Sequence, residues 1–143
     1  MERVNDLFLL VGRLLMASLF LSAGIPKIMG GFGAKYLGAL GVPYPEYVGI
    51  VATAVEVLVP VALILGLWPR ISALLLIAFV IAATVLAHRF WEYPEAQQMG
   101  QMINFTKNIA ILGGLLFYFV SGPGAFSLSG RSAGAGAAQP ARA

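Results

Sequence analysis

Residues 47–67 read YVGIVATAVEVLVPVALILGL, and this stretch contains a single charged residue, Glu56, near its middle. A helix that crosses a bilayer needs about 20 apolar residues, so the run at 48–67 is long enough to span a membrane. A carboxylate at that depth costs several kcal/mol unless it is neutral, paired or hydrated. The sequence therefore predicts a transmembrane helix and a partner for Glu56, supplied by the rest of the chain or by a bound molecule.

The composition of the whole chain favours one integral membrane domain. Of the 143 residues, 59% are hydrophobic and 10% are charged, whereas soluble domains carry about 25% charged residues. The chain has no cysteine and one histidine, His88, which excludes disulfides and cysteine-ligated metal centres. No metal site is therefore expected. The net charge of +3 is spread along the chain, so no nucleic-acid partner is expected either.

Three further apolar segments complete the predicted fold, at residues 7–23, 71–87 and 103–120. The first is expected to end at Gly24 and Pro26, because neither residue favours a continuing helix. All the segments are apolar on nearly every side, which is typical of helices immersed in lipid. The sequence therefore predicts an all-α fold, a transmembrane four-helix bundle.

The connections between these segments differ in character. Residues 24–46 are rich in glycine, with aromatic and aliphatic side chains between. They predict either a short interfacial helix that covers the bundle or an ordinary loop. Residues 88–102 form the only long polar connection. Residues 130–143 are mainly Gly, Ala, Ser and Pro, so we expect a membrane domain at 1–129 and a disordered tail at 130–143.

The distribution of basic residues predicts the orientation. Four spans place both termini on the same side of a cell membrane, which the chain would cross as a multi-pass protein. That side collects Arg3, Arg70, Arg131 and Arg142. The opposite side has Lys27, Lys35 and Arg89, diluted by three glutamates. The positive-inside rule then predicts that both termini are cytoplasmic.

Arg13 is the first candidate partner for Glu56. At about 1.5 Å per residue, the two residues lie at depths that an arginine side chain can bridge, and a guanidinium suits a carboxylate. The alternative is that Arg13 extends to the near interface. Pro60 adds a polar feature, because it cannot donate to the carbonyl of Glu56 four residues earlier. Thr53 is the nearest hydroxyl that could compensate.

A second group of polar residues gathers at the opposite end of the predicted bundle. Lys27 follows the first span, His88 ends the third, and Lys107 and Asn108 lie early in the fourth. Each has an ordinary alternative: an interface anchor for Lys27, a helix C-cap for His88, and helix–helix hydrogen bonding for the last two. With Glu56 beneath them, they predict a polar pocket that suits a neutral carbonyl ligand or the passage of a proton.

These features give the chain a resemblance to the DoxX family of small four-helix membrane proteins. The matching pieces are GRLLMASLFLSAGIPKI at 12–28, GVPYPEYVGIVATAVEVLVPVALILGLWPR at 41–70, the histidine at 88, and FTKNIAILGGLL and GPGAFSLSG within 105–130. The family pattern often ends with Ser-Leu-Asp, where this chain has Ser-Leu-Ser. The family's recurrent polar positions are matched by Arg13, Lys27, Glu56, His88 and Asn108.

The resemblance implies a redox-associated membrane subunit, since the family is named for a subunit of a quinone-reducing system in archaeal sulfur oxidation. It implies no agreed catalytic residues, so whether the chain is an enzyme stays open. Quinone is the candidate cofactor, without covalent attachment. The candidate partners are the lipid bilayer, an oxidoreductase subunit and further copies of the chain. The alternatives are a non-enzymatic small-molecule carrier and a structural or assembly subunit of a membrane complex.

Overall fold

A computed structural model describes residues 2–130, and these residues confirm the expected all-α fold. The elements are α1 (Glu2–Met29), α2 (Ala34–Ala39), α3 (Pro45–Leu65), α4 (Pro69–Ala87), the 3-10 helix η1 (Phe90–Glu92) and α5 (Glu95–Ser121). Four segments are long and apolar enough to cross a membrane by length and composition, namely Glu2–Met29, Pro45–Leu65, Pro69–Glu92 and Glu95–Ser121. The tail expected at 130–143 falls outside the described residues, apart from Gly130.

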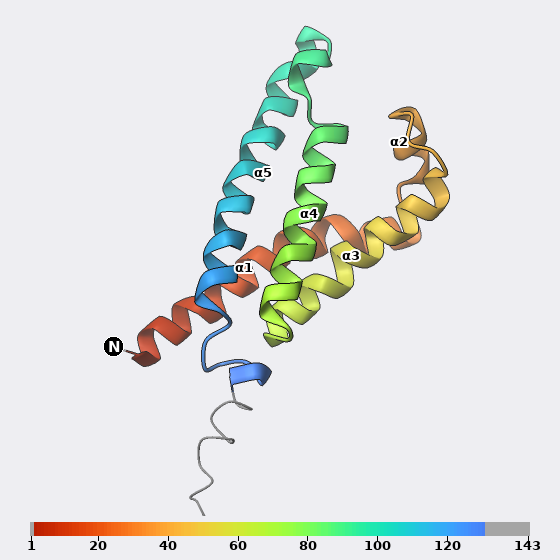
Figure 1. Ribbon diagram of the computed structural model, residues 1–143. Helices are drawn as coiled ribbons and strands as arrows, with labels where there is room; N and C mark the ends of the chain where they lie inside the picture. Colours follow the sequence, from red (N-terminus) through yellow and green to blue (C-terminus); the bar gives the residue numbers. More distant parts are fainter. Residues whose placement is uncertain (1, 131–143) are drawn as a thin grey trace, which may run out of the picture.

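The long helices form two pairs, α1 with α3 and α4 with α5 (Figure 1). The pairs meet at the end of the molecule that carries the turn between α3 and α4, which we call the closed end. They diverge toward the other end, which we call the open end, where α2 and the connection between α4 and α5 lie (Figure 1). The start of α1 and the end of α5 both lie at the closed end, as a bundle of four spans requires.

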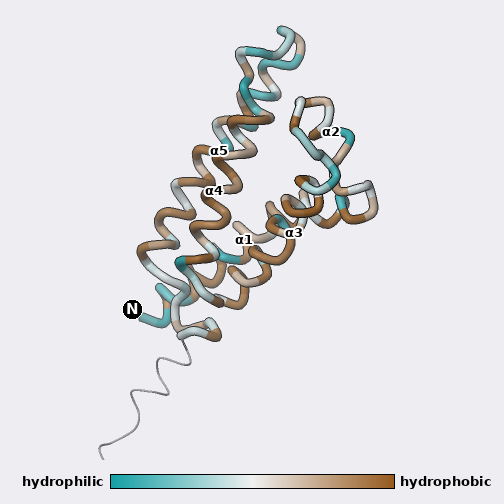
Figure 2. Tube along the Cα trace, turned by 45° about the vertical axis from the view of Figure 1, so that its right-hand side comes forward, coloured by the Kyte–Doolittle hydropathy of each residue, from teal (hydrophilic) through white to brown (hydrophobic). Residues whose placement is uncertain are grey.

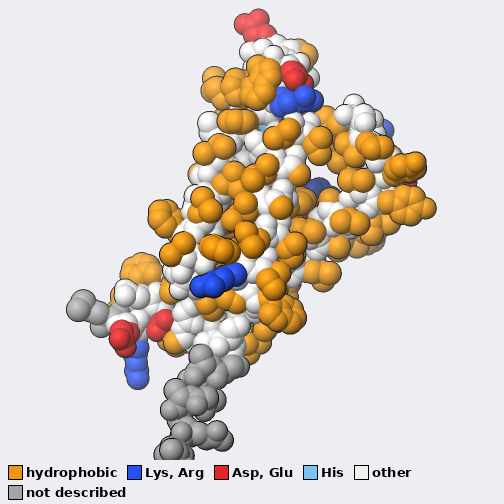
Figure 3. Space-filling view, in the orientation of Figure 1, with side chains coloured by type: hydrophobic (Ala, Val, Ile, Leu, Met, Phe, Trp, Pro, Cys, Tyr) orange, Lys and Arg blue, Asp and Glu red, His pale blue; other side chains and the backbone are white. Residues whose placement is uncertain are grey.

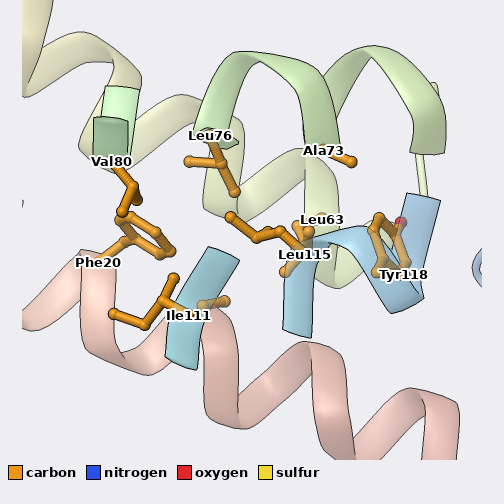
Figure 4. Packing of buried hydrophobic residues seen from close by; sticks show 9 residues of the cluster. Phe20, Leu63, Ala73, Leu76, Val80, Ile111, Leu115 and Tyr118 are labelled. Carbon is orange, nitrogen blue, oxygen red and sulfur yellow. The ribbon is translucent and has the colours of Figure 1, made fainter. Parts of the chain in front are cut away.

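Buried apolar side chains from all four long helices hold the pairs together where they meet (Figure 4). This core consists of Ala17, Phe20, Leu63, Ala73, Leu76, Val80, Ile111, Leu115 and Tyr118. The rings of Phe20 and Phe79 pack edge to face with centroids 6.4 Å apart, which joins α1 to α4. The closed end is therefore a packed core.

The outer surface of the helices is also apolar. Phe117 is 79% exposed and Leu58 is 67% exposed, although large apolar side chains are normally buried in soluble proteins. Figure 2 shows hydrophobic residues along the middle of α4 and α5 and hydrophilic residues in the connection beyond them. This pattern matches helices whose middle portions face lipid and whose ends reach water.

Helix α1 continues beyond the end that the sequence predicts. Pro26 lies inside the helix, which ends at Met29. A proline near a helix C-terminus removes one intrahelical hydrogen bond, and the following turn supplies a new one. There, the backbone N–H of Phe32 donates to the carbonyl of Lys27 at 2.7 Å. The extension keeps Lys27 on the helix, one turn beyond Gly24.

Of the two alternatives for residues 24–46, the short helix is the one present. Helix α2 lies beside the start of α3, and left-handed residues flank it on both sides. Phe32 has φ 57° before the helix, and Tyr44 has φ 51° after it. Gly49 allows the close approach, because a Cβ there would lie 2.5 Å from the carbonyl oxygen of Phe32. This contact fixes the start of the α2 segment against α3.

Candidate functional site

A half-open cavity of about 910 Å³ lies between the diverging helix pairs, and we call it the large cavity. Figure 3 shows the hollow between the α4–α5 pair and the arm formed by α2 and α3. Its volume falls in the range of about 300–1,000 Å³ that is common for small-molecule sites. Five of the six predicted site residues line it, namely Lys27, Glu56, His88, Lys107 and Asn108.

The large cavity has mainly apolar walls and opens sideways between α3 and α4. Val51 and Leu86 line it and are 64% and 44% exposed. Tyr47 also lines it and is 72% exposed. Because the sides of a membrane helix bundle face lipid, an opening on this side lets an apolar molecule reach the cavity from the bilayer.

Lys27 is the partner of Glu56, and the predicted pairing of Glu56 with Arg13 is wrong. The ammonium nitrogen of Lys27 donates to both carboxylate oxygens, at 2.7 Å to Oε1 and 2.5 Å to Oε2. The side chain of Glu56 is 7% exposed, and that of Lys27 is 39% exposed toward the cavity. The pair is therefore partly buried and forms a charged patch in a mainly apolar cavity.

The packing of α1 against α3 explains this pairing. Gly24 faces Glu56, and a Cβ at Gly24 would lie only 2.8 Å from the Cβ of Glu56. The two helices therefore approach closely at this level. Side chains on a helix tilt toward its N-terminus, so Lys27 reaches back along α1 to the carboxylate. The pairing depends on α1 continuing through Pro26.

Arg13 lies at the closed end of the bundle and does not line the large cavity. It is 2% exposed. Its Nη1 donates to the carbonyl of Ile64 at 2.9 Å, and its Nη2 donates to the carbonyl of Phe126 at 2.5 Å. The guanidinium thus ties the end of α3 to the loop that follows α5.

Thr53 is a site residue that reasoning from the sequence missed. It lines the large cavity one turn before Glu56, is 2% exposed, and its hydroxyl has no hydrogen-bond partner among the described residues. It therefore does not compensate for the bond that Pro60 removes. An unpaired buried hydroxyl costs about 1–3 kcal/mol, so a polar atom of a bound molecule beside Thr53 would remove a real penalty.

The remaining polar residues are held in place by their neighbours. Asn108 donates through Nδ2 to the hydroxyl of Thr84 at 2.8 Å, which joins α5 to α4. His88 caps α4, and its Nδ1 lies 2.8 Å from Oε1 of Gln101. Because an amide oxygen only accepts, His88 donates through Nδ1. Lys107 contacts Asn104 on its own helix at 3.1 Å.

Helix α2 forms the wall of the large cavity at the open end of the bundle. Tyr36 of α2 lines the cavity and interacts with Tyr93, in the connection between α4 and α5. The Tyr93 hydroxyl in turn donates to the carbonyl of Ala87 at 3.0 Å. Burial, and then the Tyr93 hydroxyl, raise the pKa of Tyr36 above its usual value.

The large cavity therefore combines a route from the lipid with a compact set of hydrogen-bonding groups. An ammonium has three N–H donors, and Lys27 uses two of them on Glu56. The third donor remains for a ligand, and the hydroxyl of Thr53 lies buried in the cavity wall without a partner among the described residues. Since the Lys27–Glu56 pair is neutral as a whole, this end of the cavity suits an uncharged oxygen acceptor on an apolar body.

Comparisons with known proteins place the chain among small membrane proteins. The family model described as DoxX matches residues 8–89. The inner membrane protein YphA of Escherichia coli (strain K12) is 35% identical over 128 residues, which cover 89% of this chain and 91% of YphA. The inner membrane protein YqjF of the same organism is 33% identical over 129 residues, which cover 90% and 94%. No solved structure matches the chain.

Proposed function

The chain belongs to the DoxX family, and we propose that it is a quinone-associated subunit of a membrane oxidoreductase system. The observation that carries this proposal is the unpaired hydroxyl of Thr53 beside the Lys27–Glu56 pair, at the charged patch of a cavity that opens toward lipid. A quinone matches that arrangement, because it has carbonyl acceptors on its ring and an apolar tail.

In this proposal the residues of the large cavity bind and orient the head group. Thr53 and the third N–H of Lys27 donate to one carbonyl oxygen, and Glu56, which holds the ammonium of Lys27, can relay to that oxygen the protons that quinone reduction consumes. Asn108 and His88 line the opposite wall, where they contact the far side of the ring. A bound quinone would accept electrons from a partner oxidoreductase subunit.

Thr53→Val is expected to weaken binding of a quinone analogue about tenfold without lowering stability. The change removes one hydrogen-bond donor, which is worth about 1 kcal/mol or more, and valine has nearly the same shape as threonine. The matched control is Thr106→Val, because Thr106 is exposed on α5 and, within the described residues, its hydroxyl bonds to Met102 and Ile103 of its own helix. Fluorescence quenching by the analogue in detergent measures both affinities.

Combining Asn108→Leu with Glu56→Gln tests the two walls of the cavity together. The quinone proposal predicts that this double variant binds the analogue more weakly than Thr53→Val does. Equal binding by the wild type and the double variant, or no binding by the wild type, would refute the proposal and favour the structural or assembly role.

A second function, a carrier for a small or lipidic molecule, is favoured by the construction of α2. Left-handed residues flank this helix, and Tyr36 links it to Tyr93 across the end of the large cavity. A short helix that packs on α3 and is tied across the cavity by one polar contact can swing away from Tyr93 and open the cavity to water. Flux through proteoliposomes that contain no electron acceptor would support the carrier, and quinone binding without flux would exclude it.

We further propose that the chain lies in the inner membrane with both termini in the cytoplasm. Its two relatives are named inner membrane proteins. The start of α4, which carries Arg70, lies at the same end of the bundle as the start of α1, which carries Arg3 (Figure 1). Reporter fusions at residue 131 should report the cytoplasm, and fusions within residues 90–100 should report the opposite side. The same location for both fusions would contradict this topology.

A further inference from the structure

A second cavity, of about 200 Å³, lies between α1 and α5 at the closed end of the bundle, and we call it the small cavity. Its lining includes Gly12, Arg13 and Met16 of α1 and Gly114, Tyr118 and Ser121 of α5. It shares no lining residue with the large cavity. The quinone proposal does not use it.

Arg13, which borders the small cavity, is a buried cation without an acidic partner among the described residues. It is 2% exposed, and within residues 2–130 the ion pairs join other residues, Lys27 to Glu56 and Arg89 to Glu92. Asp6, two turns earlier on α1, is engaged with the backbone N–H of Ala125 at 2.8 Å. Two backbone carbonyls contact the guanidinium, and a buried charge without a counter-charge is costly.

Two buried donors at the small cavity have no hydrogen-bond partner among the described residues. They are Nε of Arg13 and the hydroxyl of Tyr118, which is 8% exposed. They come from α1 and α5, the two helices between which the small cavity lies, so an oxyanion with several acceptor oxygens can accept from both.

The depth of the small cavity favours a group from the membrane surface. The guanidinium of Arg13 contacts Ile64, next to the last residue of α3, and Tyr118 lies one turn before the end of α5. Helix ends mark the boundary of the hydrocarbon layer. Phe8 and Phe117 border the opening and are 71% and 79% exposed, so acyl chains can lie beside it.

We propose that the small cavity binds a phosphate group, through Arg13 Nε–H and the hydroxyl of Tyr118. Phosphate supplies the missing negative charge and offers oxygen acceptors to donors alone, which is the pattern of arginine–phosphate recognition. A water molecule needs about 30 Å³, so the cavity is larger than one or two waters require. The phosphate can belong to a phospholipid head group or be free in solution.

Tyr118→Phe is the variant that tests this site, because it removes the hydroxyl and keeps the ring that packs in the core. Native mass spectrometry of the full chain in neutral detergent measures binding of phosphatidylglycerol and of a galactolipid with the same acyl chains and no phosphate. We expect the wild type to prefer phosphatidylglycerol, and Tyr118→Phe to bind it about tenfold more weakly. The control Tyr44→Phe, at an exposed tyrosine of the other end, should leave binding unchanged.

A separate titration with inorganic phosphate identifies the source of the group. If phosphate alone binds, and Tyr118→Phe weakens that binding, the site takes free phosphate. If phosphatidylglycerol binds, inorganic phosphate does not, and Tyr118→Phe weakens the lipid binding, the site takes a lipid head group. Equal binding of the two lipids without any phosphate binding, or a preference that persists in Tyr118→Phe, would overturn the proposal and leave a cavity that holds water.

Discussion

Glu56→Leu is expected to lower the free energy of unfolding by about 2–3 kcal/mol. The variant leaves the ammonium of Lys27 without the carboxylate to which it donates at 2.7 Å and 2.5 Å. Removing one partner of a buried pair costs about 3–5 kcal/mol. We expect the lower figure because the Lys27 side chain is 39% exposed and can recruit water. Denaturant titration in mixed micelles measures the change.

A double-mutant cycle identifies the partner of Glu56. Adding Lys27→Met to Glu56→Leu should recover about 1–2 kcal/mol, because no unpaired charge remains. When Arg13→Leu is combined with Glu56→Leu instead, the loss of stability should equal the sum of the two single losses within about 0.5 kcal/mol, because residues without shared partners behave independently. Coupling between Glu56 and Arg13, with none between Glu56 and Lys27, would show that the register of α1 on α3 is wrong.

The requirement for a partner at Glu56 could be predicted from the sequence, and the identity of the partner could not. A carboxylate in the middle of an apolar span needs a cation or another polar partner in any fold. Which cation pairs with Glu56 depends on the register between α1 and α3, and Gly24 sets that register by its close contact with α3. It also depends on α1 passing through Pro26, where local propensity favours an end.

The same distinction applies to the two cavities. The sequence suffices to assign four polar residues to one end of the bundle, because span lengths fix the level of each helix end. These residues are Lys27, His88, Lys107 and Asn108. Thr53 and Tyr118 carry no such signal, since a hydroxyl in a span usually bonds within its own helix. Their lack of a partner becomes visible only when the neighbouring helices are in place.

Gly66→Ala should also be strongly destabilising, by about 3 kcal/mol. Gly66 caps α3 with φ 67°, a conformation that costs energy for any residue with a Cβ. A Cβ there would also collide with the Cβ of Ser127 and lie 2.8 Å from Nη1 of Arg13. The substitution therefore strains the α3–α4 turn and pushes away the loop that follows α5. Denaturant titration in mixed micelles measures the decrease in the free energy of unfolding.

Gly41→Ala separates these two contributions. Gly41 has φ 75°, like Gly66, but nothing lies within 4 Å of a Cβ built on it. Its substitution therefore measures the backbone strain alone, about 1 kcal/mol. The excess loss at Gly66 then measures how firmly residues 122–130 dock on Arg13 and the α3–α4 turn. Equal losses at the two glycines would mean that this loop does not pack there, and Arg13 would lose the Phe126 carbonyl that the structure gives it.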